Sequence, residues 1–354
     1  MMTDQTYPQL RVLCFGAGAI GGYIGGSLAL NNHSVVFLER PEMAVQLREN
    51  GIHLTVQGET LFLAHPNVVT SIDEALTQGP YDIAILAVKS YDTDALLQSL
   101  KPYAAALPVL VCFQNGVENE QKISEVLGLH KVMYGTVTTA IGKAAPSHIV
   151  VEKLRGIGVS SNHSITPCFA SALNSAGLKA EQIYHAEGMK WSKMLTNIIS
   201  NATSAILQMS PSDVFSHAGL YHLERLQILE ALAVMKRAQI PVCNLPGVPV
   251  KLLMFVIANL PEALSRRIVA GSVGKGRGEK MPSFYLDLAA GREKSEVEYL
   301  NGAIVRYGDR YKCPTPINRA LTRILEEIVA GKRSWSAYKN APEVLLSEIE
   351  NEAV

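Results

Sequence analysis

The sequence predicts an α/β protein in which a domain built on a mostly parallel sheet precedes an all-helical domain. Short apolar runs alternate with helical patterns as far as about residue 184, which is typical of open α/β sheets. Beyond that point strand signals fade and long helical patterns follow one another. The chain has 354 residues, of which 48% are hydrophobic, so it can form two domains with a substantial core. We place the first domain at 1–185 and the second at 186–354, with a C-terminal tail from about residue 332.

Charge and cysteine content argue against a nucleic-acid-binding or membrane-binding surface, a disulfide framework and a metal site. The 32 basic residues balance 32 acidic ones, which argues against a dominant nucleic-acid or anionic-membrane surface. The apolar stretch 12–30 imitates a membrane span, but its many glycines and its strand-like beginning favour the explanation given next. The five cysteines are widely spaced and form no Cys-x-x-Cys pair, so we expect reduced thiols in a cytoplasmic protein, without disulfides or a bound metal.

The first expected elements form a strand–turn–helix–strand unit. A buried strand at 12–15 leads into a glycine turn, a helix of small residues reaches about Leu30, and a second strand follows at 34–38. The turn matches the pattern GxGxxG, and its residues are Gly16, Ala17, Gly18, Ala19, Ile20 and Gly21.

Each glycine of this turn has a role in such a unit. Gly16 allows the tight turn, Gly18 lets the backbone approach a pyrophosphate, and Gly21 permits close packing of the helix on the strand. The amides at the N-terminus of the helix would face the bound anion. In this context the motif predicts a Rossmann-type dinucleotide-binding domain. The alternative is a glycine-rich turn without a ligand.

Further strands extend the sheet, and we expect them at 81–90, 108–117, 131–142 and 148–161. Ligands of open α/β sheets bind beyond the carboxyl ends of the strands. A residue at such an end could instead be an ordinary loop residue with no ligand. Asn115 in particular precedes a glycine, and Asn-Gly is a common turn pair. The candidate ligand-binding residues at such ends are Lys89, Asn115 and Ala140.

The second half consists of helical patterns separated by proline and glycine. A nucleotide domain followed by a helical domain normally binds a small substrate in the cleft between them. We expect helices at 187–207, 217–238, 249–270, 283–307 and 316–330.

One of these helices has an unusual polar face. Lys193, Asn197, Asn201 and Ser204 follow one another at steps of three or four residues, which places them on one side of a continuous helix. Asparagine is a poor helix former because its amide competes for backbone hydrogen bonds. A merely solvated face would more naturally carry glutamate and lysine, although a wet helix face is the alternative.

These features together resemble ketopantoate reductase, also called 2-dehydropantoate 2-reductase, from about residue 11 to residue 330. The resemblance combines the GxGxxG turn, the Gln-Asn-Gly at 114–116, the Lys-x-x-x-Asn-x-x-x-Asn that begins at Lys193, and the segment 283–302. Many dinucleotide enzymes share the first motif. The later Ser-x-x-x-Asp and Ser-Glu-x-x-x-x-Asn-Gly patterns are much more specific.

The resemblance implies NADPH-dependent reduction of ketopantoate to pantoate, in pantothenate biosynthesis. Lys193 would be the general acid that protonates the carbonyl oxygen as hydride reaches the carbon. Asn197 and Asn201 would hold polar groups of the 2-oxo acid and Ser283 its carboxylate. Glu296 would contact the cofactor end of the site and help to orient the proton donor.

Asn115 would contact both cofactor and substrate, and the expected substrate-binding residues are Asn115, Lys193, Asn197, Asn201 and Ser283. The expected cofactor-binding residues are Gly16, Ala17, Gly18, Ala19, Ile20, Gly21, Arg40, Lys89, Asn115, Ala140 and Glu296.

Cofactor choice depends on Glu39 and Arg40, which end the second strand. A carboxylate there suits the 2′-hydroxyl of NADH, whereas arginine suits the 2′-phosphate of NADPH. In the family the matching arginine reads the phosphate, and we expect Glu39 to face away or to pair with a neighbouring base. NADPH is therefore the expected cofactor, and NADH is less favoured. The alternative is that Glu39 and Arg40 form an ordinary surface ion pair and bind no cofactor.

Two departures from the family pattern bear on the substrate. Lys280 lies near a position where relatives often have another substrate-contacting asparagine, and Ser-Pro-Ser-Asp at 210–213 replaces a further asparagine. A related hydroxyacid or opine-type dehydrogenase is therefore one alternative, and a non-catalytic dinucleotide sensor is another. The tail, with Trp335 and Tyr338, would pack on its own domain or on a second subunit in a homodimer.

Overall fold

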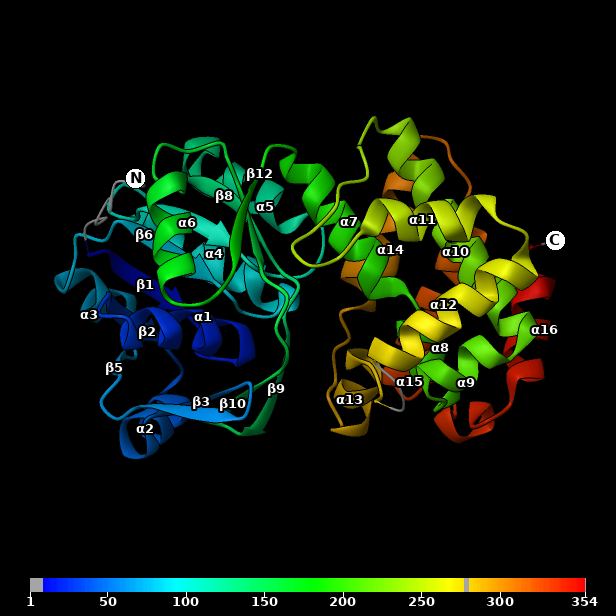
Figure 1. Cartoon of the computed structure of the whole chain (residues 1–354), viewed down its shortest axis with the longest axis horizontal. Helices are drawn as coiled ribbons and strands as arrows, with labels where there is room; N and C mark the ends of the chain where they lie inside the picture. The colour runs from blue at the N-terminus through cyan, green and yellow to red at the C-terminus, as the bar shows by residue number, and fades with distance from the viewer. Residues whose placement is uncertain (1–8, 277–279, 354) are drawn as a thin grey trace, which may run out of the picture. The chain divides into compact units, whose positions relative to one another are not determined.

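The computed structural model describes residues 9–276 and 280–353, which form two compact units (Figure 1). The first unit runs to Lys190 and includes Leu245–Val248, and the second contains the other residues from Trp191 onwards. The first unit is built on β-sheets and the second on helices, which confirms the fold class predicted from the sequence.

The main sheet of the first unit is mostly parallel. Its strands are β1 (Arg11–Phe15), β2 (Ser34–Leu38), β5 (Asn67–Val69), β6 (Ile83–Leu86), β7 (Val109–Cys112), β8 (Val132–Val137), β11 (Ile157–Ser160) and β12 (Ala180–Ile183). Among the described residues they form an eight-stranded sheet in the order β12-β11-β8-β7-β6-β1-β2-β5. Only the β8–β11 pair is antiparallel. The carboxyl ends of β1, β6, β7 and β8 therefore lie along one edge of the sheet.

Both faces of this sheet are covered by helices, namely α1 (Ala19–Leu30), α2 (Pro41–Asn50), α3 (Ile72–Thr77), α4 (Thr93–Leu100), α5 (Asn119–Leu127) and α6 (Thr166–Ser175). Side chains alternate along β1, so Val12 and Cys14 join the cluster that contains α1, α2 and α6. Leu13 and Phe15 join the opposite cluster, with α3, α4 and α5. This two-sided burial explains why the strands read as continuous apolar runs.

A second sheet was not expected from the sequence. It consists of β3 (Ile52–Val56), β4 (Glu59–Leu63), β9 (Ala140–Ala145) and β10 (His148–Lys153), in the order β4-β3-β10-β9. The expectation that 131–142 is one strand is therefore wrong, and of 148–161 only Ile157–Ser160 continues the main sheet. The chain turns a corner after β8, where the N–H groups of Thr138 and Thr139 both donate to the Gly156 carbonyl, at 3.0 and 3.3 Å.

The second unit is helical, and none of the described helices is long and apolar enough to cross a bilayer. Its helices are α7 (Ala186–Ile198), whose first residues belong to the first unit, α8 (Asn201–Leu207), α9 (Pro211–Ser216), α10 (Ala218–Arg237), α11 (Val250–Asn259), α12 (Glu262–Gly276), α13 (Ser283–Ala289), α14 (Val297–Arg310), α15 (Pro316–Val329) and α16 (Pro342–Ala353).

Three of the expected helices are interrupted. The pattern 187–207 breaks at Ser200, which has a left-handed φ of 59°. The pattern 249–270 breaks before Pro261, because proline forces the preceding residue into an extended conformation. The pattern 283–307 breaks after α13, where Gly291 has a φ of 68°.

Candidate active site

The glycine turn after β1 brings the start of α1 close to the end of the strand, and its residues are half-buried or buried. A Cβ atom at Gly21 would lie 1.8 Å from the Gly16 carbonyl oxygen, so only glycine allows this approach of α1 to the strand end. A Cβ atom at Gly18 would meet nothing within 4 Å, which leaves open space over the turn. No side chain caps the first turn of α1. Its amides are therefore available to a phosphate, and these residues fit a dinucleotide.

Glu39 and Arg40 lie next to this turn. The Glu39 carboxylate accepts hydrogen bonds from the N–H groups of Ala17 and Arg40, the second at 3.1 Å. The expectation that Glu39 faces away is therefore wrong. The Arg40 guanidinium lies 3.3 Å from Asp92, and its side chain is 77% exposed. The Glu39 carboxylate is thus bonded to the turn, whereas the Arg40 guanidinium pairs with Asp92 and not with Glu39.

Lys89 and Asn115 follow the neighbouring strands β6 and β7, each three residues after the strand ends. The Asn115 carbonyl accepts hydrogen bonds from the Ser90 hydroxyl and the Asn119 amide, both at 2.7 Å. Gly116 has a φ of 90°, a left-handed conformation that favours glycine, and the chain bends at 115–118. Ala140 differs from the expected arrangement, because it begins β9 in the second sheet rather than ending a strand.

A buried ion pair beside this edge was missed by sequence reasoning. Lys190, on α7, lies 2.8 Å from Glu120, and both side chains are almost fully buried. Lys190 also donates to the carbonyl oxygens of Gln114 and Gly135. Burial alone would lower the pKa of Lys190, but the adjacent Glu120 carboxylate raises it above its ordinary value. The four-residue spacing to asparagine singles out Lys193 on the same helix, and no such spacing marks Lys190.

In the second unit, the polar residues of the expected helix face separate into two groups. Lys193 and Asn197 lie half-buried on α7, whereas Asn201 begins α8 and is 4% exposed. Ser204 is fully buried and lies 2.8 Å from the Ser200 hydroxyl, so it does not continue the row. The break at Ser200 ends the four-residue spacing on which the expectation of one continuous face depended.

The structure brings Asn201 and Ser283 together. The Asn201 amide donates to the Ser283 hydroxyl at 3.2 Å, and its carbonyl oxygen accepts the Phe284 N–H at 3.1 Å. Asn201 therefore caps α13 and orients Ser283, whose side chain is exposed. Glu296 precedes α14 and is only 3% exposed, unlike the exposed Glu293. The motif thus singles out a buried carboxylate.

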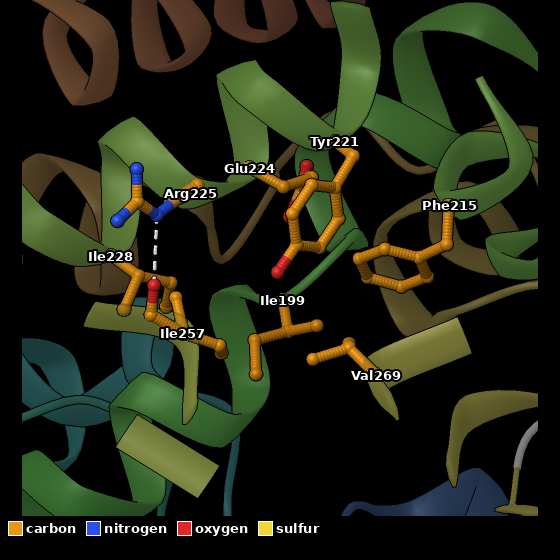
Figure 2. A pocket seen from close by; sticks show the side chains of 8 residues that line it. All are labelled: Ile199, Phe215, Tyr221, Glu224, Arg225, Ile228, Ile257 and Val269. Carbon is orange, nitrogen blue, oxygen red and sulfur yellow. Dashed lines mark hydrogen bonds between the residues drawn. The ribbon is translucent and has the colours of Figure 1, made fainter. Parts of the chain in front are cut away.

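A small pocket in the second unit is a different feature (Figure 2). It contains none of the candidate site residues and has room for about one water molecule, too little for a 2-oxo acid. Its lining residues are Ile199, Phe215, Tyr221, Glu224, Arg225, Ile228, Ile257 and Val269. Among the described residues no cluster of histidine, cysteine and carboxylate side chains could hold a metal ion.

Two family models match the chain. The model described as ketopantoate reductase PanE/ApbA matches residues 12–162, and the model of its C-terminal domain matches residues 185–329. A 2-dehydropantoate 2-reductase from Archaeoglobus fulgidus is 26% identical over 91% of this chain and 98% of its own length. One from Pyrococcus horikoshii is also 26% identical, over 92% and 100%.

Solved structures share the fold. A PanE/ApbA family ketopantoate reductase from Ralstonia eutropha matches with a TM-score of 0.76 and 26% identity, over 91% of this chain and 99% of that one. D-mandelate dehydrogenase in complex with NADH and anilino(oxo)acetate matches with a TM-score of 0.74 and 19% identity, over 91% and 99%. The models together span most of the chain, and the chain therefore belongs to the ketopantoate reductase PanE/ApbA family.

Proposed function

We propose that this protein is an NADPH-dependent 2-oxo acid reductase that converts ketopantoate to pantoate in the cytoplasm. The observation that carries the proposal is the hydrogen bond between Asn201 and Ser283. These two motif residues are the first residues of α8 and α13. The family relationship supports the same reaction, because relatives that align over almost their whole length are named 2-dehydropantoate 2-reductase.

The glycine turn and the uncapped N-terminus of α1 would hold the pyrophosphate of the dinucleotide, and Arg40 its 2′-phosphate. Lys89 and Asn115, at neighbouring strand ends, would contact its nicotinamide half. When bound, the dinucleotide supplies the hydride that the carbonyl carbon of the substrate accepts. Ala140 and Glu296 complete the proposed set of cofactor contacts.

Lys193 would donate a proton to the substrate oxygen as the C=O double bond is reduced, so that no alkoxide remains in the site. Asn197 and Asn201 would bind the polar groups of the substrate, and the exposed hydroxyl of Ser283 its carboxylate. Glu296, buried at the start of α14, would orient the donor.

A related 2-oxo acid is the second candidate substrate, favoured by the segment 210–213. Ser210 caps α9 and exchanges hydrogen bonds with Asp213 in a complete capping box. The polar groups of Ser210 and Asp213 therefore bond to each other at the start of α9. Relatives often have a substrate-contacting asparagine in this segment. A substrate that needs no such contact would fit this chain as well as ketopantoate does.

The proposal is tested by the loss of NADPH absorbance with purified protein and ketopantoate, beside a panel of 2-oxo acids that includes 2-oxoisovalerate and phenylglyoxylate. We expect ketopantoate to have the highest kcat/KM. A higher kcat/KM for another 2-oxo acid would replace the substrate and keep the reaction class. Absence of turnover with every 2-oxo acid, while NADPH still binds, would contradict the proposal.

A further inference from the structure

The family match ends at residue 329, but the described chain continues to residue 353 and packs on its own unit. Helix α16 lies against α10 and α15, and Arg333 pairs with Glu327 and with Glu348, the latter at 2.7 Å. We propose that residues 332–341, the C-terminal strap, position α8 and α13 and thereby set the affinity for the 2-oxo acid. This inference rests on the proposed function.

The strap caps the C-terminal end of α8. The Trp335 indole N–H donates to the Ala205 carbonyl at 2.8 Å, and the Asn340 N–H donates to the Leu207 carbonyl at 2.9 Å. In return, the Gln208 side-chain amide donates to the Trp335 carbonyl at 3.2 Å. The last carbonyl groups of a helix have no partner within the helix. The strap supplies these partners for α8.

The same tryptophan contacts α13. Its ring lies against that of Tyr285, with centroids 5.7 Å apart and the planes inclined at 55°. Tyr285 is on the same short helix as Ser283, and Asn201 begins α8. Trp335 therefore touches both of the helices whose first residues form the Asn201–Ser283 pair.

Helix α8 needs such external contacts because it is short. Seven residues make about two turns, and isolated helices of that length are not stable in water. All seven of its residues are buried, so packing against its neighbours and the contacts at its two ends together fix its orientation. At its start, the Glu224 carboxylate binds the Ser200 N–H and the Thr203 hydroxyl, both at 2.6 Å. At its end, the strap has the corresponding role.

These contacts predict an effect on the substrate and not on the cofactor. Trp335, Asn340, α8 and α13 all belong to the second unit, whereas the glycine turn belongs to the first. A loosened strap should therefore raise the KM for the 2-oxo acid and leave the KM for NADPH unchanged. A strap that only stabilised the fold would lower the active fraction, and so kcat, without changing either KM.

The test compares Trp335→Phe with the matched control Tyr338→Phe. The first removes the indole N–H and keeps an aromatic ring near Tyr285. The second removes a hydroxyl of the same strap that bonds to Glu348 and Arg333, at 2.6 and 2.7 Å, rather than to α8. For Trp335→Phe we expect the KM for ketopantoate to rise about two- to tenfold, the scale of one lost hydrogen bond. We expect Tyr338→Phe to leave it unchanged.

Amide hydrogen exchange gives a readout that does not depend on activity. In Trp335→Phe the amides of α8 and α13 should exchange faster than in the wild type, and those of the glycine turn should not. An unchanged ketopantoate KM, an equal rise in both variants, or a fall in kcat alone would overturn the inference. If the wild type reduces no 2-oxo acid, the proposed function fails. Faster exchange in α8 and α13 would then still support the positioning of these helices by the strap, and unchanged exchange would overturn it.

Discussion

Glu39 and Arg40 are adjacent residues of opposite charge that would have opposite effects on a bound 2′-phosphate. The Glu39 carboxylate lies on the glycine turn, where it accepts the Ala17 N–H, and it would repel a 2′-phosphate placed nearby. The Arg40 guanidinium, paired with Asp92 at 3.3 Å, is the group that would attract that phosphate. The pair of residues was visible in the sequence, but the direction of Glu39 was not, because it depends on the tertiary contact with the turn.

We predict that NADPH is preferred, by a smaller margin than an arginine alone would give. Arg40→Ala should weaken NADPH binding about tenfold or more and change NADH binding little, because only NADPH has the 2′-phosphate that would lose a charged hydrogen bond. Glu39→Gln should strengthen NADPH binding, since the repulsion is removed. Titration of both variants with both cofactors measures this. Equal losses for NADPH and NADH in Arg40→Ala would show that Arg40 does not read the phosphate.

The role of Lys193 leads to a second prediction. Lys193→Ala should lower kcat by about two orders of magnitude or more, the scale expected when a general acid is lost. The KM for NADPH should change much less, because the glycine turn is intact. Lys251→Ala, an exposed lysine on α11, is the matched control and should keep normal turnover. Near-normal kcat in a folded Lys193→Ala protein would remove Lys193 from the mechanism.

At the scale of elements, the break between α7 and α8 is held by a buried carboxylate. Glu224, on α10, accepts hydrogen bonds from the Ser200 N–H, the Thr203 hydroxyl and the Gln227 amide, each at 2.6 Å. Figure 2 shows this side chain among the apolar residues of the small pocket. Burial raises the pKa of Glu224 to about 7, although these three hydrogen bonds oppose the shift.

This shift predicts a pH-dependent stability. Because the pKa of an acid is raised in the folded state, the folded protein keeps the Glu224 proton to a higher pH than the unfolded chain does. Its contribution is full below the ordinary pKa near 4.5 and is lost as pH rises to about 7, with a total of about 3 kcal/mol.

Urea unfolding of the wild type and Glu224→Gln at pH 5 and pH 8 measures this effect, because these values lie about two units below and about one unit above the folded-state pKa of about 7. The variant should gain on the wild type as pH rises, because it has no carboxyl group to ionise. Glu293→Gln, at an exposed position, should show no such gain. A wild-type–variant difference that is the same at both pH values would contradict the prediction.

How far the elements could be predicted depended on how each is buried. The strand Arg11–Phe15 is covered on both faces, so its unbroken apolar run identified it. The strand Glu59–Leu63 is almost entirely exposed, and its residues gave no such signal. The helix break at Ser200 is held by tertiary hydrogen bonds from Glu224, which no local pattern reveals, whereas the end of α8 at Leu207 agrees with the expected pattern 187–207. The break at Pro261 was detectable locally, because proline disfavours a helical residue before it.

The candidate site shows the same limit. Its residue types could be identified from two motifs, since Lys193, Asn197 and Asn201 follow one another at four-residue steps and Ser283 begins the Ser-x-x-x-Asp pattern. The contact between Asn201 and Ser283 could not, because 82 residues separate them. Nor could the ion pair of Lys190 and Glu120, which joins residues far apart in the chain and has no motif of its own.

At the scale of the whole molecule, α7 is the element that both units share. Lys190 belongs to the first unit, where it pairs with Glu120, and Trp191 belongs to the second, where its ring packs edge-on against Tyr307 at 4.9 Å. Consecutive residues of one helix thus make their contacts in different units. Removing one of these contacts should therefore affect the cooperativity of the entire chain as well as local stability.

We predict that Lys190→Met destabilises the protein by about 3–5 kcal/mol, because it leaves the Glu120 charge buried without a partner. The double variant Lys190→Met/Glu120→Gln should recover most of this loss, since it buries no net charge. Urea unfolding followed by near-ultraviolet circular dichroism and by far-ultraviolet helix signal tests both statements. The wild type and the double variant should each unfold in one transition with coincident signals, whereas Lys190→Met should lose the sheet unit first and show two. Equal destabilisation of the single and double variants would mean that the charge pair is not what anchors α7 to the sheet.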